Sequence, residues 1–137
     1  MIEKIAVIDI GSNSARLQIT ELNNGKFRLL TEERDNIKLG KEVFEKGYFG
    51  NQSISKALRT LIKYKKIIET HNALYIRAVA TAAFREAANQ QYVANYLSKE
   101  TGIKIEVISG LEEARLIFLG VLSNFDLKIQ SLKIGFL

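Results

Sequence analysis

The chain opens on a six-residue run, residues 5–10, that is apolar except for Asp9. Its β-branched side chains and its length predict a strand that is buried on both faces of a sheet. Residues 16–22 then alternate apolar and polar side chains, and Asn23-Asn24-Gly25 can supply the left-handed backbone of a tight hairpin. A third strand is expected over residues 27–33. A chain that begins with this antiparallel meander must build its core around a sheet.

The rest of the chain alternates helical and extended patterns. Residues 38–51 contain three glycines and predict a loop with at most a short helix. The expected helices are residues 53–69, residues 81–99 with a break near Asn89, and residues 109–125; the expected strands are residues 74–80, 103–108 and 133–137. The order βββαβαβα, with helices as crossovers, predicts an α/β fold in which helices cover a mixed sheet.

Size and composition limit the class of protein. The 137 residues are enough for one domain. A formal charge of +5 fits a polyanionic partner such as nucleic acid, polyphosphate or a nucleotide, or else a small excess of surface lysine. The absence of cysteine excludes disulfides and cysteine-based zinc sites. The first apolar run is too short for a signal peptide or a membrane span, so we expect a cytoplasmic protein without a membrane partner.

A carboxylate near the end of the first strand precedes a turn of small residues. Burying Asp9 is costly unless a metal ion, water or backbone N–H groups solvate it. The run Gly11-Ser12-Asn13-Ser14 can direct N–H groups and hydroxyls towards an oxyanion. Arg16, on the next strand, can offer a charged fork of donors to a phosphate. The alternative is an ordinary hairpin turn with a capping aspartate.

A second segment, residues 77–89, joins a strand to a helix. Thr81 is expected to cap this helix, whose N-terminus at the end of a parallel strand predicts an anion site. Arg85 lies one turn into the helix and can lean towards the anion. The alternative for Arg85 is a surface ion pair with a nearby glutamate.

A third segment begins at Ser109. Ser109 and Glu112 have the spacing of a capping box, which gives Glu112 a structural role. The next residue, Glu113, is a candidate general base that acts on a water molecule, or else a second acid favoured by the helix dipole. Residues 116–125 carry no charge, so we expect this helix to be buried beyond its first turns.

Together, residues 9–17, 80–88 and 109–121 resemble the successive N-terminal signatures of the Ppx/GppA phosphatase family. Their order and spacing match along essentially the whole chain. The element order likewise resembles one lobe of the ribonuclease H-like fold of the actin-like ATPase superfamily. The resemblance implies hydrolysis of the terminal phosphoanhydride of inorganic polyphosphate, or of the 5′ phosphate of guanosine pentaphosphate, with Mg²⁺ assisting.

The resemblance also implies roles for single residues. The catalytic residues would be Arg16, Arg85 and Glu113, of which the arginines bind phosphate and the glutamate is the general base. The phosphate-binding residues would be Gly11, Ser12, Asn13 and Ser14, to which the expected helix N-terminus adds Thr81. Asp9 would belong to the same phosphate loop and bind the metal through a water molecule.

In this family a second glycine-rich phosphate loop would follow Phe136-Leu137 directly. We therefore expect residues 1–137 to be the N-terminal lobe of a two-lobed phosphatase, with the second lobe absent from this chain and the isolated lobe inactive. The expected partners are inorganic polyphosphate or guanosine pentaphosphate, with no specific nucleic acid; a homodimer of the full-length protein is compatible with the resemblance. Two alternatives stay open, a lobe of an actin-type kinase or ATPase and a regulatory module that only binds polyanions.

Overall fold

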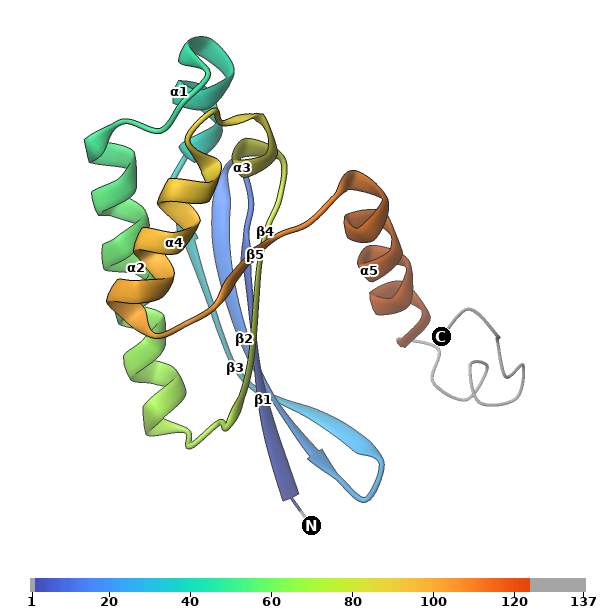
Figure 1. The fold of residues 1–137 in the computed structure, drawn as a ribbon. Coiled ribbons are helices and arrows are strands. Elements are labelled where there is room, and N and C mark those ends of the chain that lie inside the picture. Colours follow the sequence, from blue (N-terminus) through green and yellow to red (C-terminus); the bar gives the residue numbers. More distant parts are fainter. Residues whose placement is uncertain (1, 124–137) are drawn as a thin grey trace.

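The computed structural model describes residues 2–123, which form a mixed sheet with five helices (Figure 1). The strands are β1 (Ile2–Ile10), β2 (Ser14–Asn23), β3 (Lys26–Asn36), β4 (Tyr75–Ala80) and β5 (Ile105–Val107). The helices are α1 (Leu39–Lys46), α2 (Asn51–Thr70), α3 (Ala82–Glu86), α4 (Gln90–Thr101) and α5 (Gly110–Ser123). The strand order is β3-β2-β1-β4-β5, so the first strand lies at the centre of the sheet.

The predicted meander is confirmed. β1 pairs with β2 and β2 with β3, both antiparallel, and Asn24 and Gly25 turn the β2–β3 hairpin with φ angles of 53° and 76°. These are the left-handed conformations that Asn and Gly adopt at low cost. β1 also pairs with β4, and β4 with β5, both parallel, so the sheet is mixed as expected. This topology brings the carboxyl ends of β1 and β4 together at one end of the sheet.

Helices α1 to α4 cover one face of the sheet, whereas α5 stands on the opposite side (Figure 1). The core lies between the sheet and these four helices. Its largest fully buried side chains come from all four of these helices and from β1 and β2, and they include Tyr64, Phe84, Leu97, Leu39, Ile8 and Leu17. No helix among the described residues buries the other face of the sheet, and this face bears Asp9 and Arg16, which the sequence singled out.

Two predictions of burial are wrong. β1 is buried on one face only, because Ala6 and Ile8 are fully buried whereas Val7 is 40% exposed. The last predicted helix is not buried beyond its first turns either, since Ile117 is 61% and Phe118 is 50% exposed. Both errors have the same cause: an apolar pattern shows that a surface can be covered, but it does not show whether a covering element is present.

The predicted helical break near Asn89 is confirmed. Ala87 is extended, with φ and ψ of −78° and 130°, and it separates α3 from α4. The side chain of Asn89 explains the break, because it bonds both the N–H and the carbonyl of Phe49 at 2.9 Å instead of continuing a helix. Gly102, with φ of 75°, caps the C-terminus of α4. The predicted strand over residues 133–137 and the end of the last predicted helix lie outside the described residues.

No helix among residues 2–123 combines the length and the apolar character that crossing a membrane requires.

Candidate active site

The turn between β1 and β2 is held from one side by the chain that enters α1. The carbonyl of Ser12 accepts a hydrogen bond from the Gly40 N–H at 2.8 Å, and that of Asn13 accepts one from the Lys38 N–H at 2.9 Å. The C=O and N–H of a trans peptide point in opposite directions, so the Asn13 N–H points away from α1. Within residues 2–123, neither Ser12 nor Asn13 donates its own N–H to a protein acceptor. The turn therefore offers backbone donors on its free side, as an oxyanion site requires.

Other groups of the same turn are engaged within the protein. The Gly11 N–H donates to the Ser14 carbonyl at 2.9 Å, which closes the turn. The Ser14 hydroxyl donates to the side-chain oxygen of Asn36 on the edge strand β3 at 3.1 Å. The N–H groups of Ser12 and Asn13 are thus backbone donors of this turn that the described part of the chain leaves without a protein acceptor.

Asp9 lies beside Arg16, its partner across the β1–β2 ladder. One carboxylate oxygen, Oδ1, is buried and has no hydrogen-bond partner among the described residues. Burial raises the pKa of the Asp9 carboxyl; the charge of Arg16 opposes this shift, and the charge of Glu113 adds to it. Asp9, Arg16 and Glu113 therefore share one electrostatic environment, although they come from three different elements.

A buried carboxylate oxygen without a partner fits a metal ligand or a water-binding group. The described residues contain no cluster of three or more His, Cys, Asp or Glu side chains that could hold a metal ion. Mg²⁺, however, takes few protein carboxylates and completes its shell with water and phosphate oxygens. Asp9 is therefore compatible with one position in the shell of a substrate-bound Mg²⁺, directly or through water.

The second and third sequence segments meet through Arg85 and Glu113. Arg85, in α3, donates from Nη1 to the Ile108 carbonyl at 2.9 Å and from Nη2 to Glu113 Oε1 at 3.1 Å. The two side chains are 27% and 32% exposed, so solvent screens this pair only in part. Arg85 does form an ion pair with a glutamate, as the alternative had it, and its partner is the predicted general base.

The predicted helix cap at Thr81 is wrong. The Thr81 side chain makes no capping hydrogen bond, and its hydroxyl lies 3.4 Å from the Ile10 carbonyl. The Thr81 N–H donates to the same carbonyl at 3.1 Å, so this residue ties the start of α3 to the end of β1. A phosphate contact of Thr81 stays a prediction.

The predicted capping box is only half formed. The Ser109 hydroxyl accepts the Glu112 N–H at 3.0 Å, but the Glu112 carboxylate turns away to Arg115 at 3.1 Å and Arg77 at 3.8 Å. The hydrogen bond from Arg115 and the charges of Arg115 and Arg77 hold the pKa of Glu112 below its ordinary value. The adjacent glutamates thus pair with different arginines, and only Glu113 is coupled to Asp9.

Three residues near the site were not singled out from the sequence. Lys38 and Gly40 hold the turn through backbone bonds, which leave no signal in residue type. Arg77, two residues before the position that faces Asp9 in the β1–β4 ladder, could have been placed on the same face from strand alternation.

Comparison with known proteins places this chain in a family. Residues 18–134 match the model of the Ppx/GppA phosphatase family, a range that includes the second and third segments and begins just after the first. The chain is 36% identical over 128 residues to a bifunctional 3-dehydroquinate synthase/phosphatase of Fusobacterium nucleatum, covering 88% of this chain and 19% of that protein. It is 31% identical over 130 residues to exopolyphosphatase 2 of Mycobacterium tuberculosis, covering 88% of this chain and 41% of the relative.

Solved structures agree with the sequence comparisons. The Aquifex aeolicus member of the Ppx/GppA family superposes with a TM-score of 0.84 at 35% identity, over 88% of this chain and 40% of that one. An exopolyphosphatase from Cytophaga hutchinsonii superposes with a TM-score of 0.84 at 37% identity, over 87% of this chain and 38% of that one. The chain thus spans well under half the length of these relatives. Its fold, its sequence and the order of its segments all agree, and the chain belongs to the Ppx/GppA phosphatase family.

Proposed function

We propose that this chain is the N-terminal lobe of a two-lobed phosphatase that releases terminal phosphate from a phosphoanhydride substrate. Inorganic polyphosphate and guanosine pentaphosphate are the substrates that the family membership suggests. The observation that carries the proposal is the convergence of Asp9, Arg16, Arg85 and Glu113 beside a turn with free backbone donors. These groups come from four separate elements, and a chance surface cluster would not be expected to follow the order of the family's segments.

The proposed chemistry is the in-line attack of water on the terminal phosphorus. Glu113, paired with Arg85, would accept a proton from that water. The pair also orients the carboxylate, because Arg85 is itself fixed by the Ile108 carbonyl. The remaining N–H donors of the Arg85 guanidinium and those of Arg16 would hold the phosphate oxygens, together with the N–H groups of Ser12 and Asn13.

Asp9 has the remaining role. Its buried oxygen without a partner would bind Mg²⁺ or the water shell of that ion. When bound, this ion would neutralise part of the negative charge on the substrate while the terminal phosphate separates from the rest of the substrate. We propose no further metal ligands from residues 2–123.

Phosphate release from polyphosphate tests this function. The full-length protein that carries this lobe should release inorganic phosphate from long-chain polyphosphate with Mg²⁺ and without an acceptor. The 137-residue chain alone should not do so at a comparable rate, because loss of the facing groups displaces the reacting geometry. Transfer that depends on an acceptor would favour a kinase lobe instead, and binding without turnover by the full-length protein would favour a regulatory module.

A further inference from the structure

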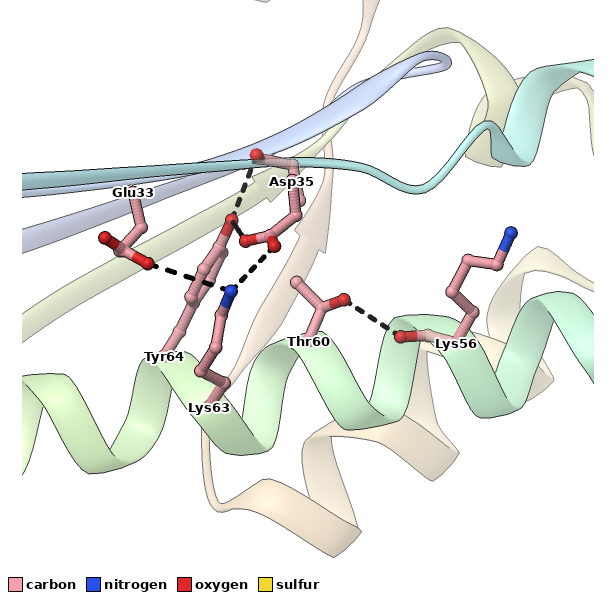
Figure 2. Close-up of polar contacts among 7 residues, drawn as sticks. Glu33, Asp35, Lys56, Thr60, Lys63 and Tyr64 are labelled. Carbon is pink, nitrogen blue, oxygen red and sulfur yellow. Dashed lines mark hydrogen bonds and ion pairs between the residues drawn. The ribbon is translucent and has the colours of Figure 1, made fainter.

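The hydroxyl of Tyr64 lies against the strand that follows the phosphate loop. Tyr64 belongs to α2 and is fully buried, and its Oη is 3.0 Å from the carbonyl of Ala15 and 2.8 Å from Asp35 Oδ2 (Figure 2). Ala15 stands between Ser14, the last residue of the loop, and Arg16, the proposed phosphate-binding arginine. A side chain far away in sequence thus touches the backbone from which both groups extend.

We infer that Tyr64 is a positioning residue for the phosphate loop, an inference that rests on the proposed function. Its hydroxyl fixes the Ala15 carbonyl. The peptide that bears this carbonyl joins Ala15 to Arg16, so it sets where Arg16 points. Ala15 itself is 1% exposed and faces the helices, whereas its neighbour Arg16 is exposed on the opposite face of the strand. A rotation of the Ala15 peptide would therefore move the Arg16 side chain on the open face.

Asp35 and Lys63 hold the hydroxyl in place. Asp35 lies directly opposite Ala15 in the β2–β3 ladder, so its carboxylate and the Ala15 carbonyl can meet the same hydroxyl. Lys63, on the same helix as Tyr64, donates to Asp35 Oδ1 at 2.6 Å and lies 3.7 Å from Glu33 (Figure 2). The carboxylate is therefore anchored at one oxygen and presents the other to Tyr64.

Because the Tyr64 hydroxyl is buried, leaving it without a hydrogen bond would be unfavourable. A hydroxyl has one proton, so Tyr64 shares it between Ala15 and Asp35 or alternates between them. Burial, with the nearby charge of Asp35, raises the pKa of Tyr64, so the hydroxyl keeps that proton throughout the physiological range. If the group only filled space, phenylalanine would serve as well, because the ring alone provides the apolar contact.

The loop then has two separate supports. The entrance to α1 holds the carbonyls of Ser12 and Asn13, and Tyr64 of α2 holds the carbonyl of Ala15. The remaining carbonyl of the loop, that of Ser14, accepts a hydrogen bond from the Gly11 N–H. Each carbonyl from Ser12 to Ala15 is bonded, so removal of one bond should loosen the loop without unfolding the lobe.

The test compares Tyr64→Phe with Ile68→Val in the 137-residue chain. Ile68 is a fully buried residue one turn further along α2, and its truncation costs about as much stability as a lost hydrogen bond while leaving the loop untouched. Amide signals of Ser12, Asn13 and Ser14 would be followed by NMR during titration with inorganic tripolyphosphate. Amide hydrogen exchange over residues 12–16 would be measured on the same samples without ligand.

Tyr64→Phe should bind tripolyphosphate about fivefold more weakly, the change that loss of one ordinary hydrogen bond produces, and should exchange faster at residues 12–16. Ile68→Val should bind as the wild type does. Equal affinity and exchange in Tyr64→Phe and wild type, or equal weakening in both variants, would overturn the positioning role alone. A wild-type chain whose loop amides do not respond to tripolyphosphate would overturn the proposed function and this role with it.

A second variant guards against failure of Tyr64→Phe to fold. Asp35 is 28% exposed, so Asp35→Ala leaves little void and removes the second acceptor of the Tyr64 hydroxyl. In Asp35→Ala, the hydrogen bond from the Tyr64 hydroxyl to the Ala15 carbonyl should be weakened rather than lost. We therefore expect faster amide hydrogen exchange at residues 14–16 and a loss of tripolyphosphate affinity of about twofold or more. Unchanged exchange and affinity in Asp35→Ala would contradict the inference.

Discussion

Arg85 and Glu113 are 28 residues apart in the sequence, and their side chains meet at 3.1 Å between Nη2 and Oε1. Glu112, the next residue along the chain, turns instead to Arg115 and Arg77. Two identical side chains at successive positions of α5 therefore have separate electrostatic partners. This division leads to different expectations for their replacement.

In the full-length protein, Glu113→Gln should lower kcat for polyphosphate by about 100- to 10,000-fold, the range of general-base catalysis. The amide keeps the size of the side chain but cannot accept the proton. Glu112→Gln should leave kcat nearly unchanged, because it loses only exposed ion pairs. Steady-state rates at saturating substrate decide between them, and a reversed order of the two variants would assign the base to Glu112.

Asp9→Asn should stabilise the isolated chain while abolishing the activity of the full-length protein. Burial of the Asp9 carboxylate is unfavourable, and Asp9 Oδ1 has no partner among the described residues. Removing the charge should raise the free energy of unfolding on the order of 1 kcal/mol. Urea unfolding without divalent metal measures this, with Glu3→Gln on the same strand as the control. A less stable Asp9→Asn chain would show that the carboxylate is well solvated.

Gly40→Ala should disturb the phosphate loop through a direct clash. A Cβ at this position would lie 2.8 Å from Ser12 Cβ and 2.9 Å from the ring of Phe44. Overpacking of this kind costs about 1–3 kcal/mol, and the amide signals of Ser12 should shift. Gly110→Ala is a fitting control, because its Cβ would meet nothing closer than Arg85 at 4.0 Å. Equal stability of the Gly40→Ala chain and wild type would mean that α1 can move away from the loop.

The stability of the lobe should depend on pH through Asp35. Burial acts to raise the pKa of Asp35, but the hydrogen bonds from Lys63 and Tyr64 outweigh it and lower the pKa below its ordinary value. Ionised Asp35 thus stabilises the fold above the pKa of the unfolded chain, and this contribution is lost as the pH falls through the lower pKa of the folded chain.

Asp35→Asn should therefore lower the free energy of unfolding at about pH 7 and reduce its decline below about pH 4. Urea unfolding at several pH values measures both effects. Glu45→Gln is the control, since Glu45 is exposed and forms no ion pair in the part of the chain that the structure describes. The same decline in Asp35→Asn and wild type would mean that other carboxylates account for the acid sensitivity.

Local signals were enough to predict the strands, the hairpin at Asn24 and Gly25, and the break before α4. They also identified Asp9, Arg85 and Glu113 as separate candidates, because each lies near the end of a strand or in the first turns of a helix. Their proximity could not be predicted from spacing, since it depends on how β1, β4 and α5 meet in space. The resemblance to the family supplied the grouping that the residue pattern lacked.

The sequence could not predict the contacts made by backbone groups or by the hydroxyl of Tyr64. Gly40 was one of several glycines in a predicted loop, and nothing local indicated that Ser12 would lie against it. Tyr64 follows the apolar spacing of its helix, which hides the role of its hydroxyl. Thr81 was expected to cap α3, but the Ile10 carbonyl offers its N–H and hydroxyl a tertiary acceptor instead.

The antiparallel register of β1 and β2 sets an order in which the site can come apart. Asp9 and Arg16 sit on one hairpin that the ladder holds along nine residue pairs, so their spacing survives any motion that leaves the hairpin intact. Glu113 depends on the attachment of α5, in which none of the side chains of residues 111–119 is fully buried. Local opening of proteins begins where few apolar contacts are buried. Gentle warming should therefore detach Glu113, the proposed general base, while Asp9 and Arg16 still lie side by side on the hairpin.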